Sequence, residues 1–186
     1  MFFALPIPCC RAKVSDRILS EVLNDVAKSR VEIFYLVDSF GSMYSEDIRM
    51  LMDKYIKALP GKTIGFHGHN NLQLAFANTI ECIMLGANML DATLLGIGRG
   101  AGNCTMELLI SFLKNPKYRL KPLLRSIQDY VKPLQQQIDW GYFMPYLISG
   151  VMNEHPKSAL AWMESDKKND YVGFLEEMMI SRDDLK

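Results

Sequence analysis

The feature that most constrains the fold of this chain is an alternation of short apolar runs with longer amphipathic runs. Residues 31–37, 63–67 and 88–95 are rich in β-branched, aliphatic and aromatic side chains, which predicts buried strands. Residues 46–59 and 72–85 place apolar side chains three and four positions apart, which predicts helices between those strands. Units of roughly thirty residues in strand–helix order require parallel strands joined by right-handed crossovers. The sequence therefore predicts an α/β fold with a parallel sheet.

Further elements are expected on both sides of this region. The apolar run at residues 2–7 predicts a strand, and the stripes at 15–27 and 105–113 predict helices. Strand signals fade after Pro116, and only helices are expected beyond it, at residues 120–137, 156–164 and 171–180. The expected organisation is an α/β part over residues 1–115 followed by a helical C-terminal extension over residues 116–186.

Composition narrows the class of protein. The chain has 186 residues, is 49% hydrophobic and 23% charged, and fits one soluble globular domain. Its 21 basic and 21 acidic residues cancel, which argues against nucleic acid or an anionic membrane as partner and favours a small molecule. No run of 18 apolar residues and no basic leader is present, and the four cysteines form no CxxC pair, so a cytoplasmic protein with reduced thiols is expected.

Two of the three histidines, His67 and His69, lie one residue apart at the end of a predicted strand. Side chains at i and i+2 of a strand leave the same face, with Cβ atoms roughly 6.5 Å apart, so both imidazoles can hold one divalent ion. The alternative reading is a pair of hydrogen-bonded histidines without a metal.

Polar residues follow the carboxyl end of each predicted strand. Asp38 and Ser39 follow the first, the histidine pair closes the second, and a glycine-rich loop at residues 96–103 follows the third. Barrels and open sheets of the α/β class place their sites at this edge. The pattern therefore indicates that the histidines take part in chemistry.

Several motifs together resemble a known enzyme superfamily. They are Asp-Ser-Phe-Gly at 38–41, His-Gly-His-Asn-Asn-Leu at 67–72, Leu-Asp-Ala-Thr-Leu-Leu-Gly at 90–96 and Gly-Arg-Gly-Ala-Gly-Asn at 98–103. In this order and spacing they resemble the metal-dependent aldolases and lyases that include 4-hydroxy-2-oxovalerate aldolase, hydroxymethylglutaryl-CoA lyase and isopropylmalate synthase. The first of these is the most similar, and it shares a segment like Val-Lys-Pro-Leu-Gln at 131–135. The resemblance is good over residues 31–113 and weakens toward residue 150.

The resemblance implies a (β/α)8 TIM barrel, of which residues 1–115 would supply about the last three or four βα units. It implies a divalent metal, Mn²⁺ or Mg²⁺, held by His67 and His69, with Asn103 as a further ligand or as a residue that orients a histidine. The family's third ligand is an aspartate in an Arg-Asp-Gly motif on the first strand, and no segment of this chain matches that motif. The same motif carries the arginine that stabilises the enolate in the family.

The implied reaction breaks or forms a carbon–carbon bond next to a 2-oxo acid by way of a pyruvate enolate. By the same resemblance, Ser39 would hydrogen-bond the substrate, and either Tyr142 or Tyr146 would lie close to it. Arg99, in the glycine-rich loop, is a candidate contact for an anionic substrate, and an exposed loop arginine is the alternative. The chain is expected to form a homo-oligomer or to complete its barrel with a partner chain.

Structural alternatives stand beside these roles. Asp38 and Ser39 can both close a turn on their own backbone, and this is the favoured role for Asp38. Asn103 can cap the helix that follows it, and Glu107 can complement the dipole of that helix. Cys104 can be reactive, and a small helix residue is the favoured reading. His155 precedes Pro156 at an expected helix start, which favours a structural role.

The sequence also has features that bear on functions other than aldolase chemistry. The glycines at 96, 98, 100 and 102 satisfy GxGxxG only with Ala101 in the last place, and no acidic residue follows at the distance that a dinucleotide site needs. The remaining alternatives are a Claisen-type acyltransferase of the same superfamily and a truncated, non-catalytic or partner-completed half-barrel. Half a barrel exposes sheet edges and an apolar inner face, which favours association.

Overall fold

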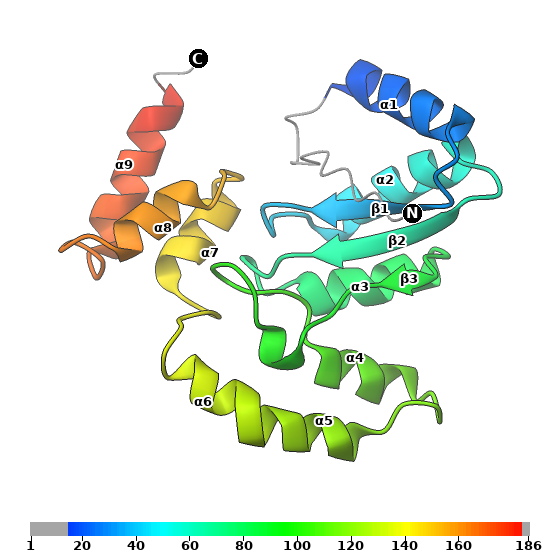
Figure 1. The fold of residues 1–186 in the computed structure, drawn as a ribbon. Coiled ribbons are helices and arrows are strands. Elements are labelled where there is room, and N and C mark those ends of the chain that lie inside the picture. The colour runs from blue at the N-terminus through cyan, green and yellow to red at the C-terminus, as the bar shows by residue number, and fades with distance from the viewer. Residues whose placement is uncertain (1–14, 184–186) are drawn as a thin grey trace.

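A computed structural model describes residues 15–183 of the chain, and side chains over residues 15–181. Within this range a three-stranded parallel sheet has the order β1–β2–β3 (Figure 1). The elements of the α/β part are α1 (Asp16–Lys28), β1 (Ile33–Asp38), α2 (Ser45–Ala58), β2 (Thr63–Gly68), α3 (Ala75–Met84), β3 (Met89–Leu90), the 3₁₀ turn η1 (Leu94–Gly96) and α4 (Met106–Leu113). The strand expected at residues 2–7 lies outside the described residues. The predicted α/β class with parallel strands is confirmed.

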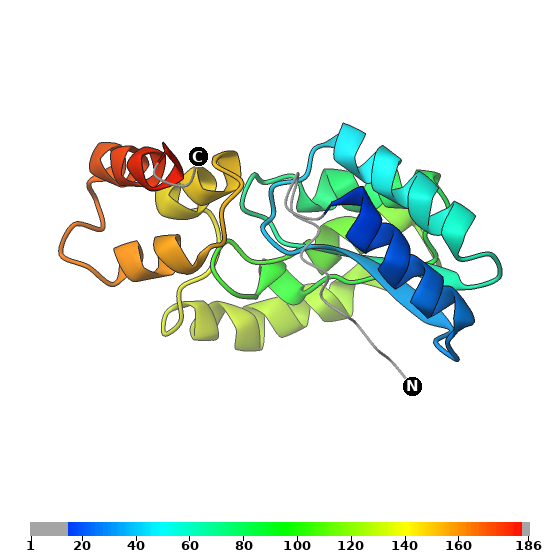
Figure 2. The same cartoon turned by 90° about the horizontal axis from the view of Figure 1, so that it is seen from above.

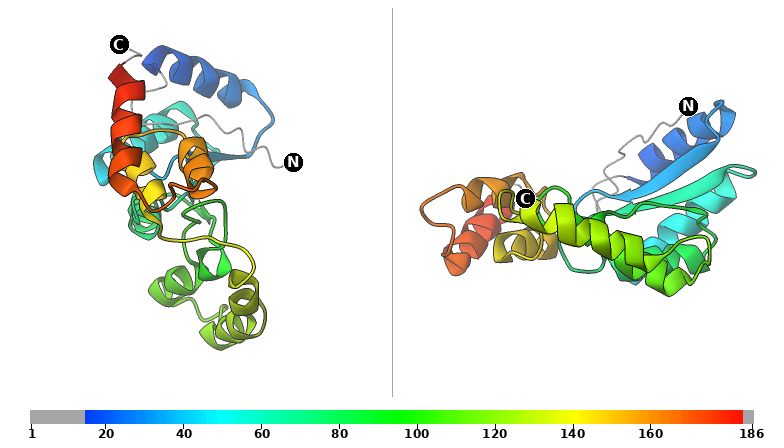
Figure 3. Two further views of the ribbon diagram at one scale, coloured as in Figure 1. Left: turned by 90° about the vertical axis from the view of Figure 1, so that its left-hand side faces the viewer. Right: turned by 60° about the horizontal axis from the view of Figure 1, so that its bottom comes forward.

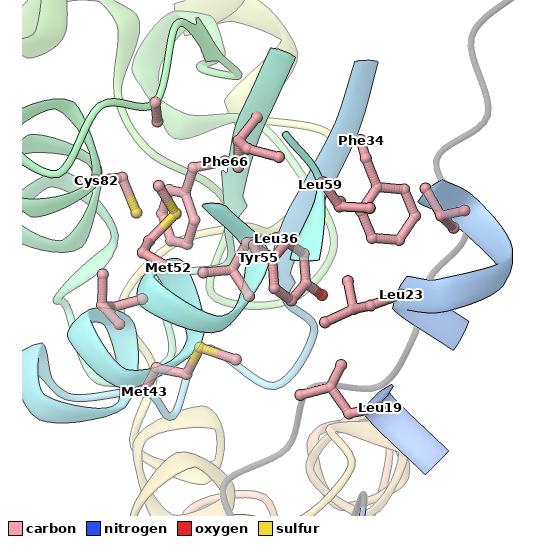
Figure 4. Packing of buried hydrophobic residues seen from close by; sticks show 14 residues of the cluster. Leu19, Leu23, Phe34, Leu36, Met43, Met52, Tyr55, Leu59, Phe66 and Cys82 are labelled. Carbon is pink, nitrogen blue, oxygen red and sulfur yellow. The ribbon is translucent and has the colours of Figure 1, made fainter. Parts of the chain in front are cut away.

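The two faces of the sheet differ in what covers them. On one face, Phe34 and Phe66 are buried against α1 and α2 in the main hydrophobic core, together with Leu36 (Figure 4). The opposite face carries the alternate positions of the same strands, with Tyr35 beside Gly65 and Val37 beside His67 in the parallel register. The helices therefore fix the sheet from one side, and the histidine belongs to the other side.

The third strand is much shorter than the run at residues 88–95 predicted. Only Met89–Leu90 pairs with β2, and the chain then leaves the sheet. Asp91 turns its side chain toward His67, and the backbone folds into η1, where Leu95 has a φ of 53°. The prediction of a strand over the whole run was wrong, because the contact of Asp91 with His67 and the turn into the glycine-rich loop end the pairing.

Helix α3 begins three residues later than expected. The segment before it forms a turn in which Asn70 accepts the Ala75 N–H through Oδ1 at 3.1 Å, and Gln73 has a φ of 60°. An Asn side chain that satisfies a helix N-terminal N–H acts as a cap, so residues 72–74 stay outside the helix.

The rest of the chain is helical, as predicted from residue 120 on. The elements are α5 (Leu120–Ser126), the π-helical segment η2 (Ile127–Val131), α6 (Lys132–Gln135), α7 (Met144–Val151), α8 (Lys157–Met163) and α9 (Tyr171–Asp183). The first three form one rod that contacts α4 and η1 (Figure 3). The π segment precedes Pro133, whose missing N–H interrupts the regular α-helical hydrogen bonds. Helix α7 was not predicted, because its sequence is almost wholly apolar and contains Gly150.

Helices α7 to α9 lie beyond the carboxyl ends of β1 and β2 (Figures 1 and 2). They pack on one another around Trp162 and Phe174 in a second apolar cluster. Asn71, which is buried just after β2, donates through Nδ2 to the Tyr146 carbonyl at 3.2 Å and joins this unit to the strand ends. Within residues 15–183, no helix has the length and apolar character needed to span a membrane.

Candidate metal centre

The two histidines lie close together at the carboxyl end of β2. His67 is on the strand, and His69 follows it, bridged to the backbone of Asn103. Their ring centroids are 5.0 Å apart and the rings are nearly perpendicular, at 80°. Because a metal–imidazole bond is about 2.1 Å long, two rings bound to one ion lie about 5 Å apart. The observed pair has this spacing.

In each histidine, Nδ1 lies next to a hydrogen-bond acceptor. His69 Nδ1 lies 3.0 Å from the backbone carbonyl of Asp38, and His67 Nδ1 lies 3.1 Å from Oδ2 of Asp91. A carbonyl oxygen and a carboxylate only accept, so each Nδ1 carries the proton. The lone pair of each neutral ring is then on Nε2, which is the arrangement of histidines that bind a metal.

The environment keeps His69 uncharged. Its pKa is lowered to about 4, mainly by burial and with a smaller contribution from the charge of Arg99, while its hydrogen bond to the Asp38 carbonyl acts in the opposite direction. A neutral imidazole is the form that coordinates a metal. His69 is thus available as a ligand over the whole physiological pH range.

Asp38 has the turn role that its sequence context favoured. Its carboxylate is buried and accepts the N–H of Ser42 and that of Met43, each at 3.1 Å. Burial raises the pKa of Asp38 and these backbone donors offset part of the rise, which leaves the pKa at about 6. The side chain therefore closes the loop after β1, while the backbone carbonyl of the same residue orients His69.

Asn103 presents a free oxygen in a buried place. Its Nδ2 donates to the Ile97 carbonyl at 3.2 Å, and its backbone N–H donates to the Gly96 carbonyl at 3.0 Å. Its Oδ1 is buried and has no hydrogen-bond partner among the described residues. A buried amide oxygen without a partner is costly, and a bound cation would satisfy it.

The loop that carries Asn103 is clamped at a strained residue. Leu95 has a φ of 53°, and its N–H donates to Oε2 of Glu107 at 3.1 Å. Its carbonyl accepts the indole N–H of Trp140 at 3.0 Å. Glu107, in the first turn of α4, therefore holds this loop by a hydrogen bond. Trp140, in the helical extension, holds the same residue of the loop through its carbonyl.

Ser39 and Arg99 lie together near the histidines. The guanidinium of Arg99 donates through one Nη to the Ser39 carbonyl at 3.3 Å. The Arg99 charge also lowers the pKa of His69, so the guanidinium lies within electrostatic reach of the histidine pair. The structure thus brings the β1 turn and the glycine-rich loop to the same place.

Of the two candidate tyrosines, Tyr146 packs against the glycine-rich loop. A Cβ added to Gly100 would lie 2.9 Å from Cε1 of Tyr146, so the ring lies directly on this backbone. Tyr146 is buried, which raises the pKa of its phenol, whereas Tyr142 is 53% exposed and hydrogen-bonds to Met144.

Two polar residues near the pair were not singled out from the sequence as site residues. Asp91 contacts His67 directly, and Tyr35 on β1 hydrogen-bonds the Asp91 carboxylate. Asp91 follows the carboxyl end of β3, which is the signal that selected the other candidates. Tyr35 could not have been found in this way, because it lies inside a strand.

The remaining candidates have structural surroundings. Cys104 is buried beside Ala75 and Leu109, and burial raises the pKa of its thiol. His155 accepts the Lys157 N–H through Nδ1, and its ring lies 5.3 Å from that of Phe40. Over the side chains described, no three His, Cys, Asp or Glu residues converge on one point. A metal here would depend on two imidazoles, the Asn103 oxygen and ligands from elsewhere.

A parallel α/β sheet with two imidazoles at its carboxyl edge has its polar site where proteins of the α/β class place theirs, at the strand ends. Comparison with known families identifies the family of the chain. A family model described as HMGL-like matches residues 8–132, and the chain belongs to that family.

Curated relatives and solved structures agree with this membership. Oxaloacetate decarboxylase of Mycobacterium tuberculosis is 49% identical over 87 residues, which are 45% of this chain and 25% of the relative. The 4-hydroxy-2-oxovalerate aldolase of Thermus thermophilus is 37% identical over 119 residues, 62% of this chain and 33% of the relative. The crystal structure of the N-terminal domain of a proposed aldolase from Bacteroides vulgatus superposes with a TM-score of 0.69 at 34% identity, covering 81% of this chain and 50% of that one.

A more distant structure supports the fold alone. HMG-CoA lyase of Bacillus subtilis has a TM-score of 0.58 at 17% identity, over 67% of this chain and 44% of the lyase. The chain spans about a quarter to a third of the two curated relatives described above. The predicted membership of the aldolase and lyase superfamily, with only part of the fold present, is confirmed.

Proposed function

We propose that this chain carries the metal site of an aldolase or lyase that cleaves or forms a carbon–carbon bond of a 2-oxo acid. The observation that carries the proposal is the histidine pair, with ring centroids 5.0 Å apart and each Nδ1 already bound to an acceptor. The names of the relatives, an oxaloacetate decarboxylase and several 4-hydroxy-2-oxovalerate aldolases, favour this class of reaction.

His67 and His69 would hold the ion through Nε2, and Asn103 would add its unpartnered Oδ1. Two nitrogen ligands and one neutral oxygen suit several divalent ions, and Mn²⁺ or Mg²⁺ is the proposal. With these residues as ligands, the ion would remain accessible to a 2-oxo acid. When bound, the ion supplies Lewis-acid stabilisation to the negative charge that develops on the keto oxygen.

For a 4-hydroxy-2-oxo acid, the bond between C3 and C4 breaks, and its electron pair passes into the enolate of pyruvate. The 4-hydroxyl loses its proton and becomes the carbonyl of the released aldehyde, and protonation of C3 completes pyruvate. Ser39 and the Arg99 guanidinium would bind the substrate carboxylate, since both lie at the same edge as the histidine pair. Tyr146, packed on Gly100, is the tyrosine proposed to border the substrate.

A second candidate reaction, decarboxylation, is favoured by the 49% identity to the oxaloacetate decarboxylase. Loss of carbon dioxide from oxaloacetate leaves the same pyruvate enolate, so the same residues would serve. The two are separated by incubating the chain with oxaloacetate or with a 4-hydroxy-2-oxo acid and measuring pyruvate release from each.

The metal site itself is tested by titration calorimetry with Mn²⁺. We expect binding by the wild-type chain, its loss in the His67→Ala, His69→Ala double variant, and its retention in His155→Ala, which removes the imidazole outside the pair. Pyruvate added to the Mn²⁺ complex is expected to bind, and to bind more weakly after Arg99→Ala. A double variant that binds Mn²⁺ as the wild type does, or a wild type that does not bind it, would contradict the proposal.

We also propose that the inner face of the sheet, which carries Tyr35, Val37 and His67, is covered by further polypeptide in the working protein. The covering chain would be a second copy of this chain or a partner. Partial exposure of Tyr35 and His67 on this face supports the proposal. Light scattering that shows a single monodisperse monomer in solution would argue against it. A cytoplasmic location fits the absence of CxxC pairs among the four cysteines.

A further inference from the structure

The strongest unexplained arrangement near the histidine pair is a chain of three polar side chains that crosses the inner face of the sheet. It runs from the Tyr35 hydroxyl on β1 to the Asp91 carboxylate after β3, and from there to His67 Nδ1 on β2, with the last contact at 3.1 Å. Three separate segments of chain are therefore linked through the Asp91 carboxylate.

The strand register explains how Tyr35 reaches across a neighbouring strand. Tyr35 pairs with Gly65, and Gly65 pairs in turn with Met89 on the far side. A Cβ at position 65 would lie 2.6 Å from Cε1 of Tyr35, so the ring passes directly over the glycine backbone. Any larger residue at position 65 would block the path from the phenol to Asp91.

The phenol acts as a hydrogen-bond donor in this chain. Burial raises the pKa of Tyr35 to about 12, and the Asp91 charge raises it in the same direction. The hydroxyl thus keeps its proton at every physiological pH. A carboxylate only accepts, so Tyr35 donates to Asp91, and Asp91 in turn accepts the proton of His67.

Packing alone does not fix the His67 ring, because its side chain is 28% exposed. The Asp91 side chain is 48% exposed and would be mobile without a second contact. The Tyr35 hydroxyl supplies that contact and restricts the carboxylate to the side that faces the imidazole. Hydrogen bonding, rather than steric confinement, then decides which nitrogen of His67 is available.

We propose that Asp91 and Tyr35 are positioning residues for His67: Asp91 holds the proton of the ring on Nδ1, and Tyr35 holds Asp91, so that Nε2 is presented as the ligand atom. This inference rests on the proposed function for its purpose. It adds two residues that would not touch the ion or the substrate. It also gives Gly65 a role, because the absence of a side chain there lets the Tyr35 ring reach Asp91.

The decisive measurement is the tautomer of His67 in the chain without metal, read from ¹⁵N shifts of the labelled imidazoles at about pH 8.5, where an ordinary histidine is neutral. We expect the wild-type ring to carry its proton on Nδ1, and Asp91→Asn to give a mixture with the Nε2–H form. His69 is an internal reference, because its proton is held by the Asp38 carbonyl and is expected to stay on Nδ1. Asp53→Asn, which removes a surface carboxylate on α2, is the matched control.

Metal affinity gives the second readout. Asp91→Asn is expected to weaken Mn²⁺ binding by about 10- to 100-fold, and Tyr35→Phe by about 2- to 5-fold. Tyr130→Phe, which removes an exposed phenol on the helical extension, should leave the affinity unchanged. Asp91→Glu should recover part of the loss, since the carboxylate is retained.

The two readouts separate failure of this inference from failure of the proposed function. A wild-type His67 with its proton on Nε2, or a tautomer that does not respond to Asp91→Asn, overturns the positioning role whatever metal binds. Mn²⁺ binding that is unaffected by Asp91→Asn also overturns it. A wild-type chain that binds no Mn²⁺ overturns the proposed function, and the tautomer result still reports on the hydrogen bonds.

Discussion

At the scale of single residues, Asp38 and His69 show how one residue can serve both a turn and a site. The Asp38 carboxylate closes the loop after β1, and its backbone carbonyl holds the His69 ring at 3.0 Å. Burial shifts the two pKa values in opposite directions, to about 6 for Asp38 and about 4 for His69. In both cases burial favours the neutral form.

The shift of His69 predicts a measurable dependence of stability on pH. Its folded pKa of about 4 is below the ordinary value of about 6.5, so between these values the unfolded chain binds more protons than the folded one. The free energy of unfolding should therefore fall as the pH is lowered through this window, and the contribution is fully present above it. His69→Asn keeps a donor for the Asp38 carbonyl and does not titrate.

Urea unfolding of both proteins at about pH 7 and about pH 5 tests this, and the wild type should lose about 1 to 2 kcal/mol relative to the variant. Asp38 titrates in both proteins, and its opposite contribution cancels in the comparison. An equal loss in wild type and variant would show that His69 is protonated in the folded chain.

Some of the residues near the histidine pair could be predicted from the sequence and others could not. Because polar residues at the carboxyl ends of parallel strands lie at one edge of the sheet, the sequence predicted that Ser39, the histidine pair and Arg99 lie close together. The structure places them close together. Their roles remain proposals. Asp91 obeys the same rule and was overlooked, and Tyr35 escaped it because a long side chain over a glycine depends on register between strands, which a single sequence does not display.

At the scale of elements, the loop after β1 owes its shape to one close approach. Gly41 has a φ of 60°, and a Cβ there would lie 2.5 Å from the backbone nitrogen of Asn71. Its carbonyl accepts the Leu72 N–H at 3.0 Å, which ties the loops after β1 and β2 together. The loop geometry around the site therefore requires a residue without a Cβ.

Gly41→Ala is predicted to lower the free energy of unfolding by about 3 kcal/mol or more, because the clash is with backbone that cannot move aside. Gly61→Ala is the matched control, since Gly61 also has a positive φ, of 81°, but has no atom within 4 Å of an added Cβ. Only left-handed strain, about 1 to 2 kcal/mol, is expected there. Equal costs in denaturant unfolding would contradict the close approach.

Element boundaries were predicted well where periodicity dominates and poorly where polar contacts intervene. The expected ranges for α1, α2, β1 and β2 differ from the structure by one or two residues at most ends. The failures were the long third strand, the early start of α3 and the missing α7. The first and third reflect tertiary contacts, of Asp91 with His67 and of α7 with the buried Asn71. The second reflects a local one, the Asn70 side chain on the Ala75 N–H.

At the scale of the whole molecule, the helical extension and the strand ends form one unit. Asn71 is 3% exposed and donates to the Tyr146 carbonyl at 3.2 Å and to Ser149 Oγ at 3.3 Å, and Ser42 Oγ donates to Asn153 Oδ1 at 2.8 Å. Trp140 also reaches the glycine-rich loop. The proposed boundary near residue 115 thus marks a change of secondary structure, and it remains a prediction as a division into domains.

Asn71→Ala is predicted to weaken the packing of the helical extension on the strand ends. Two hydrogen bonds from a buried side chain are lost, at a cost of about 1 to 3 kcal/mol, and the connection between α8 and α9 should be cleaved faster in limited proteolysis. Asn88→Ala changes an exposed residue whose side chain donates to the nearby Gly86 carbonyl, and serves as the control. A cleavage rate that is the same in wild type and Asn71→Ala would show that other contacts hold the extension.

The proposal that His67 and His69 bind one divalent ion can be tested by pulsed electron paramagnetic resonance of the Mn²⁺-loaded chain. With ¹⁵N-labelled histidine, we expect couplings from two imidazole nitrogens, one of which disappears in His67→Ala and the other in His69→Ala. The His155→Ala spectrum should match that of the wild type. A Mn²⁺ spectrum without imidazole coupling, or one that both single variants leave unchanged, would contradict the claim.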